Sequence, residues 1–134
     1  EKDPHLLLAA QHNLVRCYIE ADQPEEALAV HCAARPLYHD CRAPLILLRA
    51  TWQEGSLLSE IGHLNNAAAA LLRARQGFTE QGLAYETALV SLDLVEVYSK
   101  LGKAEEIRQV VAETTTIFRA MCLSREVLAS LLHV

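Results

Sequence analysis

A repeat with a period of 40 residues constrains the fold of this chain more than any other feature. The segments 22–27, 62–67 and 102–107 align with one another, and each joins a turn to the start of an apolar pattern. Two aromatic columns keep the same spacing, namely Tyr18, Leu58 and Tyr98, and Tyr38, Phe78 and Phe118. Because only 5% of the residues are aromatic, chance does not explain two aligned aromatic columns, and they predict one structural unit used three times.

Apolar residues inside each unit recur with helical spacing. Val90, Leu94 and Tyr98 lie four residues apart, which gives one buried stripe along a helix. Small residues such as Ala27 and Ala34 allow two helix backbones to approach closely. Leu and Ala supply most of the apolar residues, and both favour helix. The chain is therefore predicted to be all-α.

Proline and glycine mark where the helices begin and end. Pro4, Pro24 and Pro44 suit the first turn of a helix, and Gly62 and Gly102 suit a left-handed residue at a helix end. The predicted helices span 4–21, 24–40, 44–61, 65–80, 84–101, 104–121 and 123–133. They form helical hairpins over 4–41, 44–81 and 84–121, followed by a closing helix over 123–133. We interpret 1–134 as a single domain, excised from a longer protein because it begins at Glu1.

This pattern resembles the tetratricopeptide repeat, in a variant with a 40-residue period. The residues that carry the resemblance are Leu14, Val15, Tyr18, Ala27 and Ala34, then Gly55, Leu58, Gly62, Ala67 and Ala74, then Leu94, Tyr98 and Gly102. The third unit departs from the family by having Ile107 and Thr114 at alanine positions. The resemblance implies a right-handed superhelical stack of antiparallel helix pairs, as found in signalling scaffolds and in sensor regions of bacterial transcription regulators.

The resemblance also implies where a partner would bind. First helices of successive units line the concave surface in this family, which brings there a set of polar and aromatic residues. The candidate partner-binding residues are His12, Arg16, Arg49, Trp52, Ser56 and Glu96. Because guanidinium groups grip carboxylates and tryptophan often anchors interfaces, an acidic or C-terminal peptide segment is the expected ligand.

An alternative interpretation gives several of these side chains a structural role. In it, Arg16 and Arg49 pair with Glu20 and Glu54, and Trp52 packs between units. Glu54 occupies the column of Leu14 and Leu94, so it should point towards the core. A carboxylate there needs a partner, for which Arg35 and Arg16 are the candidates.

Composition argues against several classes of partner. The net charge is −5 and the basic residues are dispersed, which does not favour nucleic-acid binding. Charged residues interrupt each apolar run before it reaches the length of a membrane span. The irregular spacing of Cys17, Cys32, Cys41 and Cys122 favours reduced thiols and a cytoplasmic location.

The sequence favours neither metal binding nor catalysis. His31, Cys32, His39 and Cys41 are potential zinc ligands, but adjacent helical residues point about 100° apart, and His31 lies in a packing column with Leu71 and Val111. No nucleophile lies in a recognisable catalytic motif and no phosphate loop is present. We therefore expect no metal, no cofactor and no enzymatic activity.

The function expected from the sequence is an interaction scaffold or sensor module that binds a protein or peptide on its concave surface. Two alternatives stay open. The exposed end helices would make a homodimer, or the module would be the ligand-sensing arm of a bacterial transcription regulator.

Overall fold

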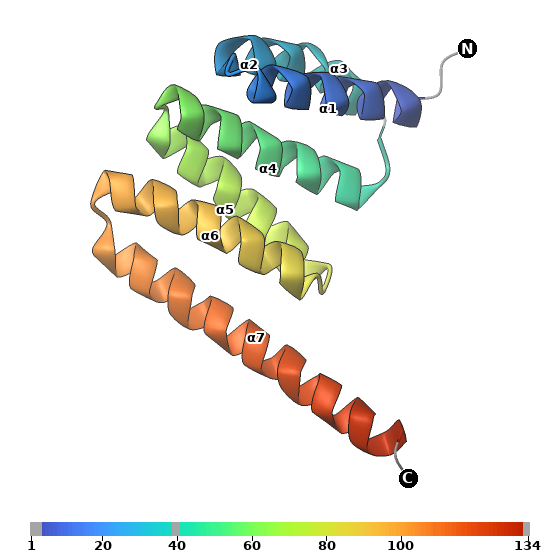
Figure 1. The fold of residues 1–134 in the computed structure, drawn as a ribbon, viewed down its shortest axis with the longest axis vertical. Coiled ribbons are helices and arrows are strands. Elements are labelled where there is room, and N and C mark those ends of the chain that lie inside the picture. Colours follow the sequence, from blue (N-terminus) through green and yellow to red (C-terminus); the bar gives the residue numbers. More distant parts are fainter. Residues whose placement is uncertain (1–3, 39–40, 133–134) are drawn as a thin grey trace.

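The computed structural model describes the backbone of residues 4–38 and 41–132, and the side chains of 6–38, 41–120 and 129–131. The described part consists of helices joined by short turns (Figure 1). The helices are α1 (Pro4–Glu20), α2 (Pro24–Ala33), α3 (Arg35–Tyr38), α4 (Pro44–Ile61), α5 (Leu64–Glu80), α6 (Ala84–Leu101) and α7 (Ala104–Leu132). The predicted all-α class is confirmed, and the bounds of α4 and α6 agree with those expected from the sequence.

The 40-residue repeat is visible in the turns between the helices of each pair. Asp22, Gly62 and Gly102 all adopt a left-handed backbone, with φ of 59°, 97° and 72°. In each turn, the amide after this residue donates to a carbonyl five residues earlier. The three hydrogen bonds join Gln23 to Tyr18, His63 to Leu58 and Lys103 to Tyr98, at 2.8, 2.9 and 2.9 Å. Each turn thus satisfies the last carbonyls of its helix in the same way.

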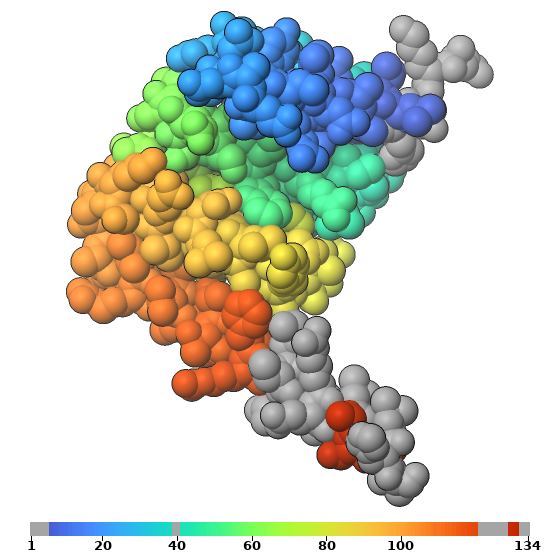
Figure 2. All heavy atoms as spheres, in the orientation of Figure 1, coloured from blue at the N-terminus to red at the C-terminus, as the bar shows by residue number. Residues whose placement is uncertain are grey.

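The helix pairs lie next to one another in chain order (Figure 2). α2 packs on α1 and on α4, and α5 packs on α4 and on α6. The main core lies between α4, α5, α6 and α7, where Leu71, Phe78, Val90 and Leu94 have no exposed surface. A smaller cluster of Val15, Ala27 and Leu57 joins the first pair to α4. The apolar columns of the sequence therefore supply the core where the second and third pairs meet, whereas Leu14 and Phe118 of the same columns are exposed.

The helix predicted over 24–40 is wrong, because it breaks at Ala34. Pro36 has no amide hydrogen to donate to Cys32, and its ring disfavours a helical conformation at the preceding residue. The Leu37 amide donates instead to the Ala34 carbonyl at 3.0 Å, and the short helix α3 follows. The last two predicted residues, 39 and 40, lie outside the described residues.

The closing helix predicted over 123–133 is also wrong as a separate element. α7 runs without a break from Ala104 to Leu132, and its far end extends away from the other helices (Figure 1). The preceding junctions contain Pro44 and Gly82, whereas the equivalent segment 121–124 has neither proline nor glycine. Nothing in this segment interrupts helical hydrogen bonding, so the helix continues.

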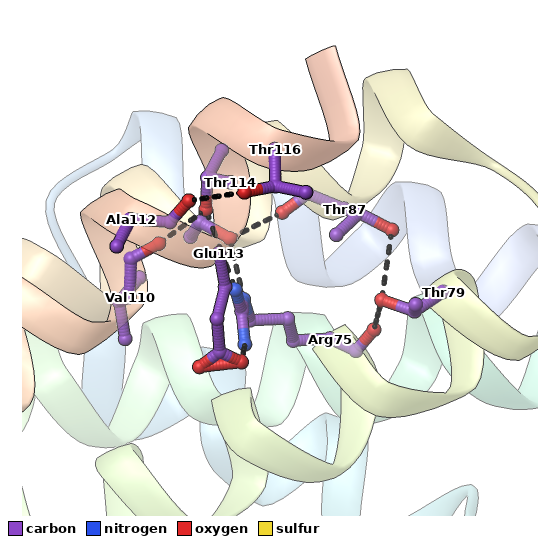
Figure 3. Close-up of polar contacts among 9 residues, drawn as sticks. Arg75, Thr79, Thr87, Val110, Ala112, Glu113, Thr114 and Thr116 are labelled. Atoms are coloured by element: carbon purple, nitrogen blue, oxygen red, sulfur yellow. Dashed lines mark hydrogen bonds and ion pairs between the residues drawn. The ribbon is translucent and has the colours of Figure 1, made fainter. Parts of the chain in front are cut away.

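A polar network around Arg75 holds the third pair against the second (Figure 3). The Arg75 side chain, only 11% exposed, points from α5 towards α6 and α7. Its Nε donates to Ser91 Oγ at 2.7 Å and its Nη2 to Thr114 Oγ1 at 3.4 Å. Its Nη1 lies 3.7 Å from the Glu113 carboxylate. One cation thereby joins α5, α6 and α7.

Candidate functional site

A cavity between α1, α3 and α4 brings together two of the predicted partner-binding residues. His12 comes from α1 and Arg49 from α4, and the cavity has a volume of about 220 Å³. Apolar and small side chains complete the wall, together with one amide and one phenol. These are Leu8, Ala9, Asn13, Tyr38, Ile46 and Ala50. A carboxylate is absent from this lining in the described part of the chain.

The charges around this cavity are positive. Burial lowers the pKa of His12, and the nearby Arg16, Arg49 and His31 lower it further. Arg16 makes only a long contact of 4.0 Å to Glu20, and both side chains are mostly exposed. Arg49 has no ion-pair partner within the described residues. The cavity therefore offers an uncompensated guanidinium beside an apolar wall.

A second cavity, of about 240 Å³, lies between α4 and α6 and contains the predicted residues Ser56 and Glu96. Its charges are mainly negative, since Glu60 and Asp93 also line it. Burial raises the pKa of Asp93, its hydrogen bond with Trp52 lowers it, and the nearby Glu96 raises it again. Lys100 lines the cavity too and lies 3.6 Å from the Glu96 carboxylate.

Trp52 lies on α4 between the residues that contribute to the two cavities. Its indole Nε1 donates to Asp93 Oδ2 at 2.8 Å, which ties α4 to α6. Its ring meets Phe78 edge-on, with centroids 5.7 Å apart and an interplanar angle of 79°. The side chain is half-buried against the main core. Trp52 therefore packs between units, as the alternative interpretation holds, and it is not a freely exposed anchor.

Two polar residues singled out in the sequence have structural roles. Glu54 pairs with Arg35 and is largely covered, so the ion pair expected from the Leu14 and Leu94 column is confirmed. His31 is buried, as expected for a core residue, and its Nδ1 lies 3.3 Å from Gln53 Oε1. The expected pairing of Arg49 with Glu54 is wrong, because Arg35 takes that carboxylate.

The described cysteines carry free thiols. Cys17 is exposed, Cys32 half-buried and Cys41 buried. Within the described residues, histidine, cysteine and acidic side chains form no group able to hold a metal ion. His39 and Cys122, which entered the sequence argument, fall outside the side chains described. Over the same described portion, every helix is too short or too polar to cross a bilayer.

Comparisons with protein-family models, curated proteins and solved structures give no match to this chain. The site therefore has to be interpreted from its own geometry. Sequence reasoning missed Tyr38 and Ile46 as cavity residues, because both lie outside the first-helix positions taken from the repeat. It also missed a third, apolar cavity between α6 and α7, although Val111 and Phe118 in its lining belong to the repeat columns.

Proposed function

We propose that this chain is a helical-repeat interaction module of the tetratricopeptide type, and that the face formed by α1, α4 and α6 binds a segment of a partner protein. The three matching turns at Asp22, Gly62 and Gly102 support the repeat. A right-handed superhelical stack belongs to the same proposal. So does a cytoplasmic sensor or scaffold role in bacteria, with which the free thiols of Cys17, Cys32 and Cys41 agree.

The observation that carries the proposal is the pair of oppositely charged cavities along α4. Arg49 lines the positive cavity and Ser56 the negative one, with Trp52 between them. These residues are spaced i, i+3 and i+7, so they share one face of the helix. Seven residues of helix span roughly 10 Å. The two cavities are therefore close enough for one ligand segment to reach both.

The charges specify the kind of segment that fits. A carboxylate, from a side chain or a chain terminus, pairs with Arg49 in the positive cavity. A lysine or arginine then lies near Glu60 and Glu96 in the negative cavity. Glu60 lies eleven residues beyond Arg49 on α4, which is about 16 Å of helix. Since an extended chain covers about 3.3 Å per residue, roughly five residues separate these two ligand charges. The ligand is thus a short extended peptide with an acidic and a basic residue at that separation.

Trp52 supplies the signal for testing this, because it is the only tryptophan in the chain. Intrinsic fluorescence would be recorded during titration with peptides in which the acid-to-base spacing varies. Binding should be strongest at the predicted spacing and should weaken with salt. Arg49→Ala should weaken binding of the best peptide by tenfold or more, since a charged hydrogen-bonded pair is lost. Arg73→Ala is the matched control, because Arg73 is exposed on α5.

Two outcomes of the titration would contradict the proposed function. Equal affinity for peptides with both charges reversed, or equal loss in the Arg49→Ala and Arg73→Ala variants, would show that the cavities do not select the ligand. Circular dichroism of each variant separates loss of binding from loss of folding. Arg49 is exposed, so its replacement should leave helical content unchanged.

A further inference from the structure

An apolar groove lies between α6 and the first half of α7. It encloses a cavity of about 270 Å³ with almost no polar surface, and its lining contains no charged side chain. Its exposed large apolar members are Tyr85 and Leu92 from α6 and Val111 and Phe118 from α7. Tyr85 and Leu92 are each about two thirds exposed, at 64% and 67%. Large apolar side chains exposed in one groove indicate a surface that another element covers.

The repeat register shows that this groove consists of core positions without a cover. Forty residues earlier, Leu71 and Phe78 occupy the columns of Val111 and Phe118. Leu71 and Phe78 are fully buried, because α6 covers the α4–α5 pair. Val111 is 50% exposed and Phe118 37% exposed. The missing cover is therefore a helix placed on α7 as α6 is placed on α5, and antiparallel to it.

The sequence in register with that missing helix is residues 124–132, which belong to α7 itself. Leu128 continues the column of Leu48 and Ala88, and Leu131 continues that of Ser91, which is 2% exposed. Because α7 is one straight helix, this segment cannot lie in the groove of its own chain. It extends instead, and Leu131 is 66% exposed.

We propose that two copies of this chain form a twofold dimer in which 124–132 of each α7 lies in the α6–α7 groove of the other. In this dimer the two α7 helices run antiparallel. Residues 124–132 of one copy therefore run antiparallel to α7 of the other copy, which is the direction of the missing helix. The segment has nine residues, about 13 Å of helix, and the groove on α7 spans the same length from Val110 to Phe118. An uncharged groove also brings no like charges together, despite the net charge of −5.

Sedimentation over a range of concentrations tests the dimer directly. The wild-type chain should move from a mass of 14.8 kDa to twice that value as concentration rises. Leu131→Glu should abolish the dimer from the helix side, and Leu92→Glu from the groove side. Both side chains are mostly exposed, so neither replacement should unfold the chain. Leu72→Glu, on the exposed surface of α5, is the control and should dimerise like wild type.

The second test introduces the turn sequence of residues 81–84 at residues 121–124. Met121→Gln, Cys122→Gly and Ser124→Ala together convert 121–124 into the Gln-Gly-Leu-Ala sequence of 81–84, where Gly82 has φ of 73°. The end of α7 should then fold back onto its own groove and leave a monomer. A monomeric wild type at every concentration, a dimeric Leu131→Glu variant or a dimeric turn variant would each overturn the proposal. The peptide titration above is independent of all these outcomes.

Discussion

The indole of Trp52 donates a hydrogen bond to the carboxylate of Asp93 at 2.8 Å, across the boundary between the second and third helix pairs. This contact joins residues 41 positions apart, and Asp93 also lines the negative cavity. It has two effects. It orients the indole beside Phe78, and it holds a carboxylate where burial disfavours its charge.

Asp93→Asn should therefore stabilise the chain at neutral pH or leave it unchanged. The amide oxygen keeps an acceptor for Trp52 and removes a partly desolvated charge. Because burial raises the folded-state pKa of Asp93, protonation of Asp93 favours the folded state. The advantage of the variant should be greatest above that pKa and should disappear as pH falls below the ordinary value of 3.8. Denaturant unfolding at several pH values measures this. Asp93→Ala, which removes the acceptor, should be less stable than Asp93→Asn.

A second prediction concerns the buried His31. Burial lowers its pKa, which outweighs the raising effects of Glu54 and of the hydrogen bond with Gln53, and Arg35 lowers it as well. The unfolded chain then binds the proton more tightly, so stability should fall as pH drops below 6.5. His12, whose pKa is lowered too, contributes in the same direction.

His31→Gln should reduce this pH dependence, because an amide can replace the contact with Gln53 without titrating. Melting temperatures of the two proteins should differ in slope between pH 7 and 5. A matched variant, His63→Gln, changes an exposed histidine and should leave the slope as in wild type. Identical slopes for wild type and His31→Gln would show that the buried imidazole does not govern acid sensitivity.

A third prediction follows from the close approach of α4 and α5. A Cβ added at Gly55 would lie 2.8 Å from the Leu71 side chain and 3.3 Å from the Leu71 backbone nitrogen. Gly55→Ala should cost about 1–3 kcal/mol of unfolding free energy, because the helices must separate. Helix propensity acts the other way, by about 1 kcal/mol. Urea denaturation decides between them, and a more stable variant would mean that the helices are not in tight contact.

Arg75 gives the fourth prediction. Arg75→Lys should destabilise the chain by about 1–3 kcal/mol, because one ammonium cannot reach Ser91, Thr114 and Glu113 in the three directions of a guanidinium. Arg73→Lys changes an exposed neighbour on the same helix and should have almost no effect. Chemical denaturation gives the unfolding free energy of both variants. The difference between them is the contribution of the Arg75 network, because the exchange of arginine for lysine is common to both.

Local chemistry explains which parts of this fold can be predicted from the sequence. Pro44, Gly62 and Gly102 fix where α4 and α6 begin or end, because proline and left-handed glycine act on the residues next to them. The same chemistry indicates that α7 is continuous, since 121–124 lack both residue types, although the 40-residue period argues for a turn there. Where period and local chemistry disagree, local chemistry decides.

The cavities depend instead on contacts between distant residues. Arg49 and His12 were expected on one face, and they do share a cavity. The repeat register did not predict that Trp52 bonds to Asp93. This hydrogen bond depends on where the two side chains lie in the folded structure, which the 40-residue period does not specify. Tyr38 lines the positive cavity and belongs to the short helix α3, which follows the break at Ala34. The sequence predicted one uninterrupted helix over 24–40 and therefore did not predict this position for Tyr38.

The ion pair between Glu54 and Arg35 leads to the last prediction. Glu54 stands in a column where the equivalent Leu94 is fully buried, and its own side chain is 18% exposed. Glu54→Leu should leave stability unchanged or raise it, because a leucine fits the apolar surroundings and Arg35, already 58% exposed, stays hydrated. Arg35→Ala should instead cost about 1 kcal/mol, since it leaves a covered carboxylate without its partner. A double-mutant cycle over the two positions measures the pair. If Glu54→Leu proved the more damaging change, the carboxylate would have a role in packing that leucine cannot fill.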